Sequence, residues 1–224
     1  MNDGTPSSDP DTRDTGGVLL SLRRRVRGEG IEEGELRPVP SATDPPVPHT
    51  EPEPLAVERS FGFVDISGFT AFCDRHGELH AFELLATFRT TTRAVAARRG
   101  VRVAKWLGDG VMLVGLDPAA LAATVAEITM RCRVAGLDTH AGVATGSVLL
   151  FEGDDYVGRP VNLAARLCDH AQLGELLVVG RPADLPDWLT VAEERTLEIA
   201  GVDGPVAVQR VEPRRDVDAG FTAA

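Results

Sequence analysis

The feature of this 224-residue sequence that most restricts its fold is a succession of short apolar runs and longer amphipathic stretches that begins near Leu55. Short apolar runs are typical of buried strands, whereas apolar residues that recur every three or four positions are typical of helices. The two kinds of segment occur in the order strand, helix, strand, strand, helix, strand, with further strands after them. This order predicts an α+β sandwich in which the helices pack on one face of a mainly antiparallel sheet.

The individual segments follow from their patterns. Arg59–Ile66 is predicted to be a strand, and the Ser-Gly turn after it leads into a helix in which Leu79, Phe82, Leu85 and Phe88 recur. A second helix is predicted over Pro118–Val134, because Asp117 is a good N-cap before proline at the first helical position. Its buried stripe would be Leu121, Val125, Ile128 and Cys132. The other predicted elements are a hairpin of VRVAKWL and VMLVG, a strand pair of THAGVATG and SVLLFE, a helix over Arg159–His170, and strands at ELLVV, EERTLEI and PVAVQRV.

The chain divides into three parts by composition. Residues 1–54 are rich in proline and contain no aromatic residue, so they are predicted to be a disordered or regulatory N-terminal extension. Within them, Val18–Gly28 places four apolar residues on one helical face among arginines, which allows either a short docking helix or a transient helix in a disordered tail. Residues 55–212 are predicted to be the folded domain, and residues 213–224 a flexible C-terminal tail.

Composition and charge exclude several classes of function. The net charge of −11 disfavours nucleic-acid binding, since phosphate contacts require clustered lysine and arginine. No apolar run is long enough for an integral membrane segment, and the first residues lack the features of an export signal, so we expect a cytoplasmic protein. Neither cysteines nor histidines show the spacing of metal ligands, so no role is assigned to them: Cys73, Cys132, Cys168, His49, His76, His80, His140 and His170.

Two aspartates stand out by their positions. Strand alternation places Asp65 on the same face as Phe61 and Phe63, at the end of an apolar strand, where it is either a turn or N-cap acid or a metal ligand. Asp109 lies in a Gly-Asp-Gly sequence that is also favourable for a hairpin turn. Since the first strand and this hairpin are expected to be neighbours, the two carboxylates would repel unless a cation lay between them. Oxygen ligands of this kind suit Mg²⁺.

Two further stretches carry polar residues in positions that suit a nucleotide site. Lys105 is embedded in an apolar strand, where it either protects a sheet edge or donates into a pocket. Asn162 and Arg166 are four residues apart in a predicted helix, so their side chains share one face. An amide beside a guanidinium can bind phosphoryl oxygens, although the same pattern also fits a solvated helix surface.

Three motifs together resemble a known family. FVDISGFT, KWLGDG and DYVGRPVNLAAR, in this order and spacing, resemble the class III nucleotidyl cyclase catalytic domain, and the likeness runs from about Glu58 to Val211. The resemblance implies a ferredoxin-like palm fold and a head-to-tail homodimer with shared active sites. It also implies the activity of an adenylate cyclase, which converts ATP to 3′,5′-cyclic AMP and pyrophosphate with two Mg²⁺ or Mn²⁺ ions per site.

The resemblance also assigns roles to residues. Asp65 and Asp109 match the two metal-binding aspartates, with the Ile66 backbone as a further ligand. Lys105 and Asp155 match the pair that selects the purine. Asn162 and Arg166 match the transition-state residues. The triphosphate is expected at the backbone N–H groups of Ser67, Gly68, Phe69 and Thr70.

The sequence departs from the family pattern in two places. Ala200 precedes Gly201, where the family often carries a basic residue, so one triphosphate contact is expected to be missing. The segment 180–196 is short and interrupted by proline, which puts the dimer affinity in doubt. Two alternative functions stay open at this point: a guanylate cyclase, and a non-catalytic nucleotide-binding or dimerisation module that regulates a partner.

Overall fold

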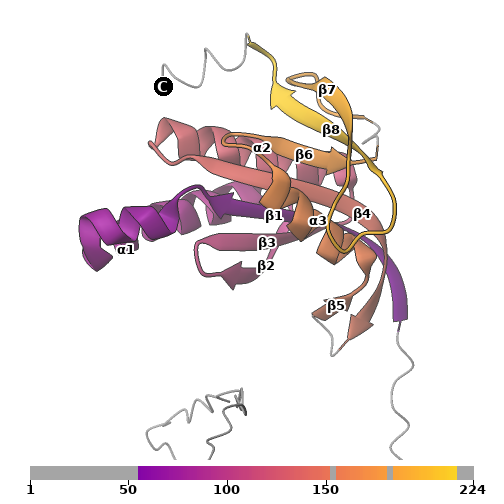
Figure 1. Cartoon of the computed structure of the whole chain (residues 1–224), viewed down its shortest axis with the longest axis horizontal. Helices are drawn as coiled ribbons and strands as arrows, with labels where there is room; N and C mark the ends of the chain where they lie inside the picture. Colours follow the sequence, from indigo (N-terminus) through magenta and orange to yellow (C-terminus); the bar gives the residue numbers. More distant parts are fainter. Residues whose placement is uncertain (1–54, 152–154, 181–183, 216–224) are drawn as a thin grey trace, which may run out of the picture. The chain divides into compact units, whose positions relative to one another are not determined.

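The computed structural model describes residues 55–151, 155–180 and 184–215. The predicted extension over residues 1–54, with its Val18–Gly28 segment, and residues 216–224 of the predicted tail lie outside the described residues. Figure 1 shows the arrangement of helices and strands. In chain order they are β1 (Leu55–Ile66), α1 (Phe69–Arg99), β2 (Arg102–Leu107), β3 (Gly110–Gly115), α2 (Pro118–Val134), β4 (Thr139–Phe151), β5 (Asp155–Val157), α3 (Arg159–His170), β6 (Leu176–Val179), β7 (Leu189–Leu197) and β8 (Val206–Pro213).

The strands form a single mixed sheet in the order β2-β3-β1-β4-β6-β8-β7, with β5 paired to β4. The β4–β6 pair is parallel and the other pairs are antiparallel. The predicted α+β class and mainly antiparallel sheet are therefore confirmed. The predicted strand pair over THAGVATG and SVLLFE is instead one continuous strand, β4, because Gly146 is accommodated within extended backbone that pairs along the whole of β1.

The helices cover both faces of the sheet, which corrects the prediction that they pack on one face. α1 and α2 pack on the face that carries Val64, Leu113 and Val143. α3 packs on the opposite face, against Phe61 and Leu177, and lies in front of the sheet in Figure 1. The central strands bury apolar side chains on both faces, so a layer of helix is needed on each side.

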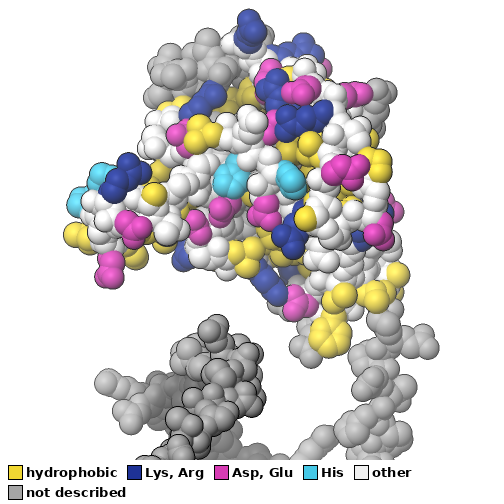
Figure 2. Space-filling model, viewed as in Figure 1, with side chains coloured by type: hydrophobic (Ala, Val, Ile, Leu, Met, Phe, Trp, Pro, Cys, Tyr) yellow, Lys and Arg dark blue, Asp and Glu magenta, His cyan; other side chains and the backbone are white. Residues whose placement is uncertain are grey.

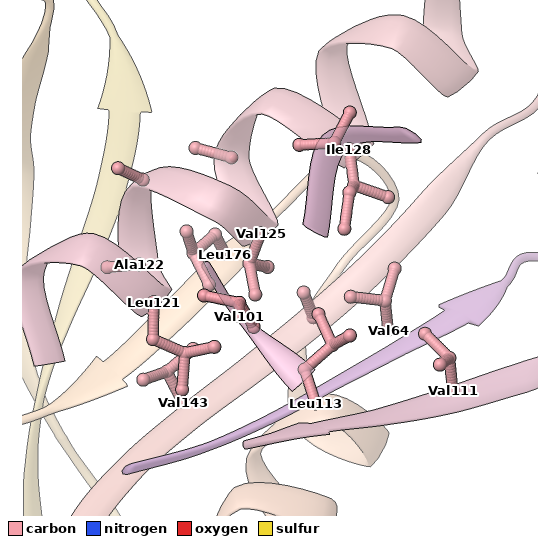
Figure 3. Packing of buried hydrophobic residues seen from close by; sticks show 14 of the residues in the cluster. Val64, Val101, Val111, Leu113, Leu121, Ala122, Val125, Ile128, Val143 and Leu176 are labelled. Carbon is pink, nitrogen blue, oxygen red and sulfur yellow. The ribbon is translucent and has the colours of Figure 1, made fainter. Parts of the chain in front are cut away.

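The larger core lies between the sheet and α2, as Figure 3 shows. The predicted stripe of α2 is confirmed, since Leu121, Val125, Ile128 and Cys132 are fully buried. The Asp117 side chain caps α2 by accepting hydrogen bonds from the backbone N–H groups of Ala119 (2.8 Å) and Ala120 (3.3 Å).

The three-residue repeat in α1 identifies the helix correctly, but its members are not equally buried. Phe88 is buried, whereas Leu79 and Phe82 are 69% and 68% exposed. The helix is kinked at Gly77, whose φ of 81° is not helical. Leu79 and Phe82 follow this kink, so it is not the cause of their exposure. A repeat of exactly three residues falls short of the 3.6 residues of a helical turn, which places Leu79 on the side of α1 opposite Phe88.

Two further observations bear on the predictions from composition. Within the described part of the chain no helix is long and apolar enough to cross a membrane. The three cysteines are free thiols. Burial raises the pKa of the Cys132 and Cys168 thiols to about 12, so both stay protonated near neutral pH.

Candidate active site

Asp65 lies near the end of β1, on the face of the sheet that α3 covers. In the antiparallel β1–β3 ladder it is the register partner of Gly110. A Cβ atom at position 110 would lie only 2.7 Å from Oδ1 of Asp65, so the carboxylate lies over the glycine. Asp109 is the residue just before Gly110, in the turn between β2 and β3. The prediction that the first strand and this hairpin are neighbours in the sheet is therefore confirmed.

The electrostatics of Asp65 show that the two carboxylates interact. Burial raises the pKa of Asp65, and the negative charges of Asp109 and Asp169 raise it further. His140 and a hydrogen bond from the backbone N–H of Ile66 act in the opposite direction. A half-buried carboxylate that is repelled by a second one suits a divalent cation, and both donors are the hard oxygens that Mg²⁺ and Mn²⁺ prefer. The donor set therefore fits the metals that the resemblance implies.

The side chains around these two acids do not complete a metal site alone. Among residues 55–151, 155–180 and 184–215, no group of three or more His, Cys, Asp and Glu side chains is placed to hold a metal ion. The remaining ligands of an ion at Asp65 and Asp109 would have to come from backbone carbonyls, water or the phosphates of a substrate.

The turn that carries Asp109 is held from α1. The Arg89 guanidinium donates a hydrogen bond from Nη2 to the Gly108 carbonyl (3.3 Å) and lies over the Trp106 ring, 5.2 Å from its centroid. Arg93 lies over the same ring at 5.1 Å. These contacts connect the Gly-Asp-Gly turn to a helix that precedes it by about twenty residues, so the position of Asp109 depends on α1 as well as on the hairpin.

His140 belongs to this site, although no spacing in the sequence predicts a role for it. It is the register partner of Asp65 in the β1–β4 ladder. Its Nε2 lies 3.8 Å from Oδ2 of Asp65, and its Nδ1 is hydrogen-bonded to the Ser67 hydroxyl at 2.9 Å. Figure 2 shows histidine and acidic side chains close together on the face that carries α3. Only the register of β1 on β4 brings His140 here, and no spacing in the sequence indicates it.

The predicted phosphate site lies at the start of α1. Gly68 is the N-cap in the left-handed conformation (φ 70°), and no side chain in the described part of the chain caps the helix. The Ser67 N–H donates to the Asp138 carbonyl at 2.9 Å, so it is already engaged. The N–H groups of Gly68, Phe69 and Thr70 precede the first turn and lack intrahelical acceptors. An anion at this helix end would therefore meet three of the four predicted amides.

Lys105 on β2 and Asp155 at the start of β5 form an ion pair, although they are fifty residues apart. Both side chains are about half exposed. Asp155 reaches this place because β5 turns back onto the end of β4, where it pairs with Phe151. The structure thus brings together the two residues that the resemblance assigns to purine selection, at the surface and accessible to a ligand.

Asn162 and Arg166 lie on one face of α3, as the spacing predicts, and line a cavity of about 390 Å³. The other side of the cavity is the loop that carries Ala200, which contributes no basic side chain. Arg166 Nη1 lies 3.6 Å from Asp169 Oδ2. The described lining residues are Asn162, Ala165, Arg166, Asp169, Ala200, Gly201 and Val202.

The structure does not join all predicted site residues into one place. Among the described residues, no hydrogen bond or ion pair connects Asp65 or Asp109 with Asn162 or Arg166. Asp169, which lines the α3 cavity, lies close enough to Asp65 for its charge to raise the pKa of that carboxyl, but Asn162 and Arg166 make no direct contact of this kind with the acidic pair.

The chain resembles several known proteins. It is 37% identical to the uncharacterized protein Rv2212 of Mycobacterium tuberculosis over 175 residues, which covers 75% of this chain and 46% of that protein. It is 38% identical to an adenylate cyclase of Streptomyces coelicolor over 120 residues, covering 52% of this chain and 31% of that one. The chain thus spans less than half the length of these curated relatives. A scan against protein-family models matches none.

Solved structures show the same fold. The adenylyl cyclase CyaB from P. aeruginosa is similar with a TM-score of 0.60 and 25% identity, covering 73% of this chain and 98% of that chain. The guanylyl cyclase Cya2 is similar with a TM-score of 0.63 and 20% identity, covering 72% of this chain and 95% of that chain. With its element order, its sheet and these likenesses, the chain belongs to the class III nucleotidyl cyclase family and has the fold of that family's catalytic domain.

Proposed function

We propose that this protein is an adenylate cyclase, which converts ATP to 3′,5′-cyclic AMP and pyrophosphate in a homodimer with shared active sites. The observation that supports ATP as the substrate is the ion pair between Lys105 and Asp155. Adenine presents an amino donor at position 6 and an acceptor at N1, which a carboxylate and an ammonium complement. Guanine reverses both groups and would leave polar side chains of the protein unpaired.

The reaction forms a bond from the ribose O3′ to the α-phosphorus and breaks the bond from that phosphorus to pyrophosphate. Asp65 and Asp109, with the Ile66 carbonyl, would hold two Mg²⁺ or Mn²⁺ ions, which when bound acidify the 3′-hydroxyl and neutralise phosphate charge. The free amides at the start of α1 bind triphosphate oxygens.

The residues of α3 act on the reacting part of the substrate. Arg166 donates hydrogen bonds to the α-phosphoryl oxygens as negative charge develops there, which stabilises the transition state. Asn162 orients the ribose. Because no hydrogen bond or ion pair joins these residues to the acidic pair in the described part of one chain, we propose that a second copy supplies them to each site. This is an isologous arrangement with two equivalent active sites per dimer.

The test is a cyclase assay with ATP and with GTP, in Mg²⁺ and in Mn²⁺, over a dilution series of the protein. We expect cyclic AMP from ATP, little cyclic GMP, and a specific activity that falls on dilution as dimers dissociate. Cyclic GMP as the main product would instead identify a guanylate cyclase. No product at high protein concentration would favour a non-catalytic nucleotide-binding or dimerisation module.

A further inference from the structure

The cavity beside α3 has an unusual balance of charge for a site that binds a triphosphate. Arg166 is the one cationic side chain among its described lining residues, and Asp169 is the one acidic side chain. The opposite wall, which includes Ala200 and Gly201, adds no charge. The negative charge of Asp169 therefore cancels the positive charge of Arg166, and the described lining residues include no second cation.

The two charged residues are neighbours on the helix. They are three residues apart, which places their side chains together on one helix face. The distance of 3.6 Å from Arg166 Nη1 to Asp169 Oδ2 makes an ion pair that is too long for a good hydrogen bond. Asp169 is also the one ionic partner of Arg166 in the described part of the chain. One carboxylate contact thus restrains an otherwise exposed guanidinium.

The backbone that carries Asp169 is held firmly. A Cβ atom at Gly142 would lie 2.4 Å from both the Ala164 carbonyl oxygen and the Cys168 nitrogen, so this end of α3 lies directly on β4. The Cys168 thiol also donates to the His140 carbonyl at 3.4 Å. The backbone of Asp169 is therefore fixed, and its exposed side chain reaches from this point toward Arg166.

We propose that Asp169 is a positioning residue for Arg166, holding one edge of the guanidinium so that its other N–H groups are directed at the α-phosphoryl group. This inference rests on the proposed cyclase function. A planar guanidinium has five N–H donors, so one edge can meet the carboxylate while the other meets a phosphoryl oxygen. The negative charge of Asp169 also repels the triphosphate, so the residue improves turnover at some cost in binding.

This combination predicts a specific kinetic signature. Asp169→Asn keeps the size of the side chain but removes its charge, so kcat falls about two- to fivefold, as expected for loss of an exposed ion pair. The KM for ATP stays unchanged or falls, because a repulsive charge has been removed. Glu78→Gln is the matched control, since it removes one exposed acid from α1, away from the cavity, and leaves both constants unchanged.

A double-mutant cycle tests whether Asp169 acts through Arg166. In an Arg166→Ala background, assayed at high protein concentration, Asp169→Asn has no further effect on kcat if the inference is right. The inference is overturned if Asp169→Asn raises kcat, leaves it unchanged, or lowers it equally in both backgrounds. A raised KM with a lowered melting temperature would also overturn it, because that result indicates a merely structural role.

A second readout does not depend on turnover. NMR relaxation of the Arg166 Nε–Hε group, assigned by its loss in Arg166→Ala, reports how firmly the guanidinium is held. We expect greater mobility in Asp169→Asn than in the wild type, and no change in Glu78→Gln. If the wild type makes no cyclic nucleotide, the proposed function fails, and unchanged Arg166 mobility in Asp169→Asn would independently overturn the positioning role.

Discussion

The Asp65 carboxylate occupies the space above Gly110, where any side chain at position 110 would displace it. Because Gly110 has no positive φ, alanine can adopt its backbone conformation. The added methyl group clashes with the carboxylate, whereas its other neighbour, the Val64 carbonyl oxygen, lies at 3.4 Å. We expect Gly110→Ala to lower kcat/KM by about 10- to 100-fold, since small displacements of catalytic groups have effects of this size. Cyclase kinetics and Mn²⁺ titration measure the loss.

Gly115→Ala is the control for this change. Gly115 is in the same strand, and a Cβ atom there would make an ordinary contact of 3.5 Å with Leu121. We expect nearly wild-type kinetics from this variant. Equal losses in the two variants would mean that the strand, rather than Asp65, is affected.

Complementation tests whether active sites are shared between copies. Asp65→Ala and Asn162→Ala are each expected to be inactive as homodimers, because both sites of each lack one residue. A mixed dimer has one intact site and one site that lacks both residues. With random exchange of chains, activity recovers to roughly a quarter of the wild type. Demonstrated exchange without recovery would show that each chain carries its own complete site.

Exchanging the charges of Lys105 and Asp155 distinguishes a role in base selection from a contribution to stability. Lys105→Asp combined with Asp155→Lys keeps an ion pair at this place, with the positions of the two charges exchanged. Both side chains are about half exposed, so we expect the free energy of unfolding to change by less than about 1 kcal/mol. Cyclic AMP formation should nevertheless fall strongly, because both hydrogen-bonding partners of adenine are then wrong. Retained ATP turnover in the swapped protein would argue against base selection by this pair.

Glu127 on α2 provides a prediction about stability and pH. Burial alone would raise the pKa of its carboxyl, but hydrogen bonds from Arg131, Arg99 and Arg98 outweigh burial and hold the pKa below the usual 4.5. The three contacts measure 2.7, 2.7 and 2.6 Å. We expect Glu127→Gln to reduce the free energy of unfolding by about 1–3 kcal/mol at pH 7, since charged hydrogen bonds are lost in a partly buried place.

The sign of the pH effect follows from the lowered pKa. A carboxyl whose pKa is lower in the folded state stabilises the fold above its unfolded value and loses this contribution as pH falls through the folded value. The difference between wild type and Glu127→Gln should therefore be present at pH 7 and shrink below about pH 4.5. Urea denaturation at several pH values measures it, and a difference that grows on acidification would contradict the assignment.

Local patterns in the sequence were sufficient for much of the fold. The helix over Arg159–His170 and the N-cap at Asp117 were predicted correctly, because periodicity and capping depend on residues close in sequence. The motifs around Asp65, Asp109 and Asn162 also indicated the family that the fold confirms. The roles assigned to these residues remain predictions, which the experiments above test.

The sequence by itself determined which segments become helices and strands, and which acids stand at strand ends and turns, because neighbouring residues decide backbone conformation. Only the tertiary structure decided that α3 covers the face opposite α1 and α2, that His140 lies beside Asp65, and that Lys105 meets Asp155. These relationships depend on strand register and on layers packing together. Both are set by contacts between residues far apart in the chain, and no local spacing records them.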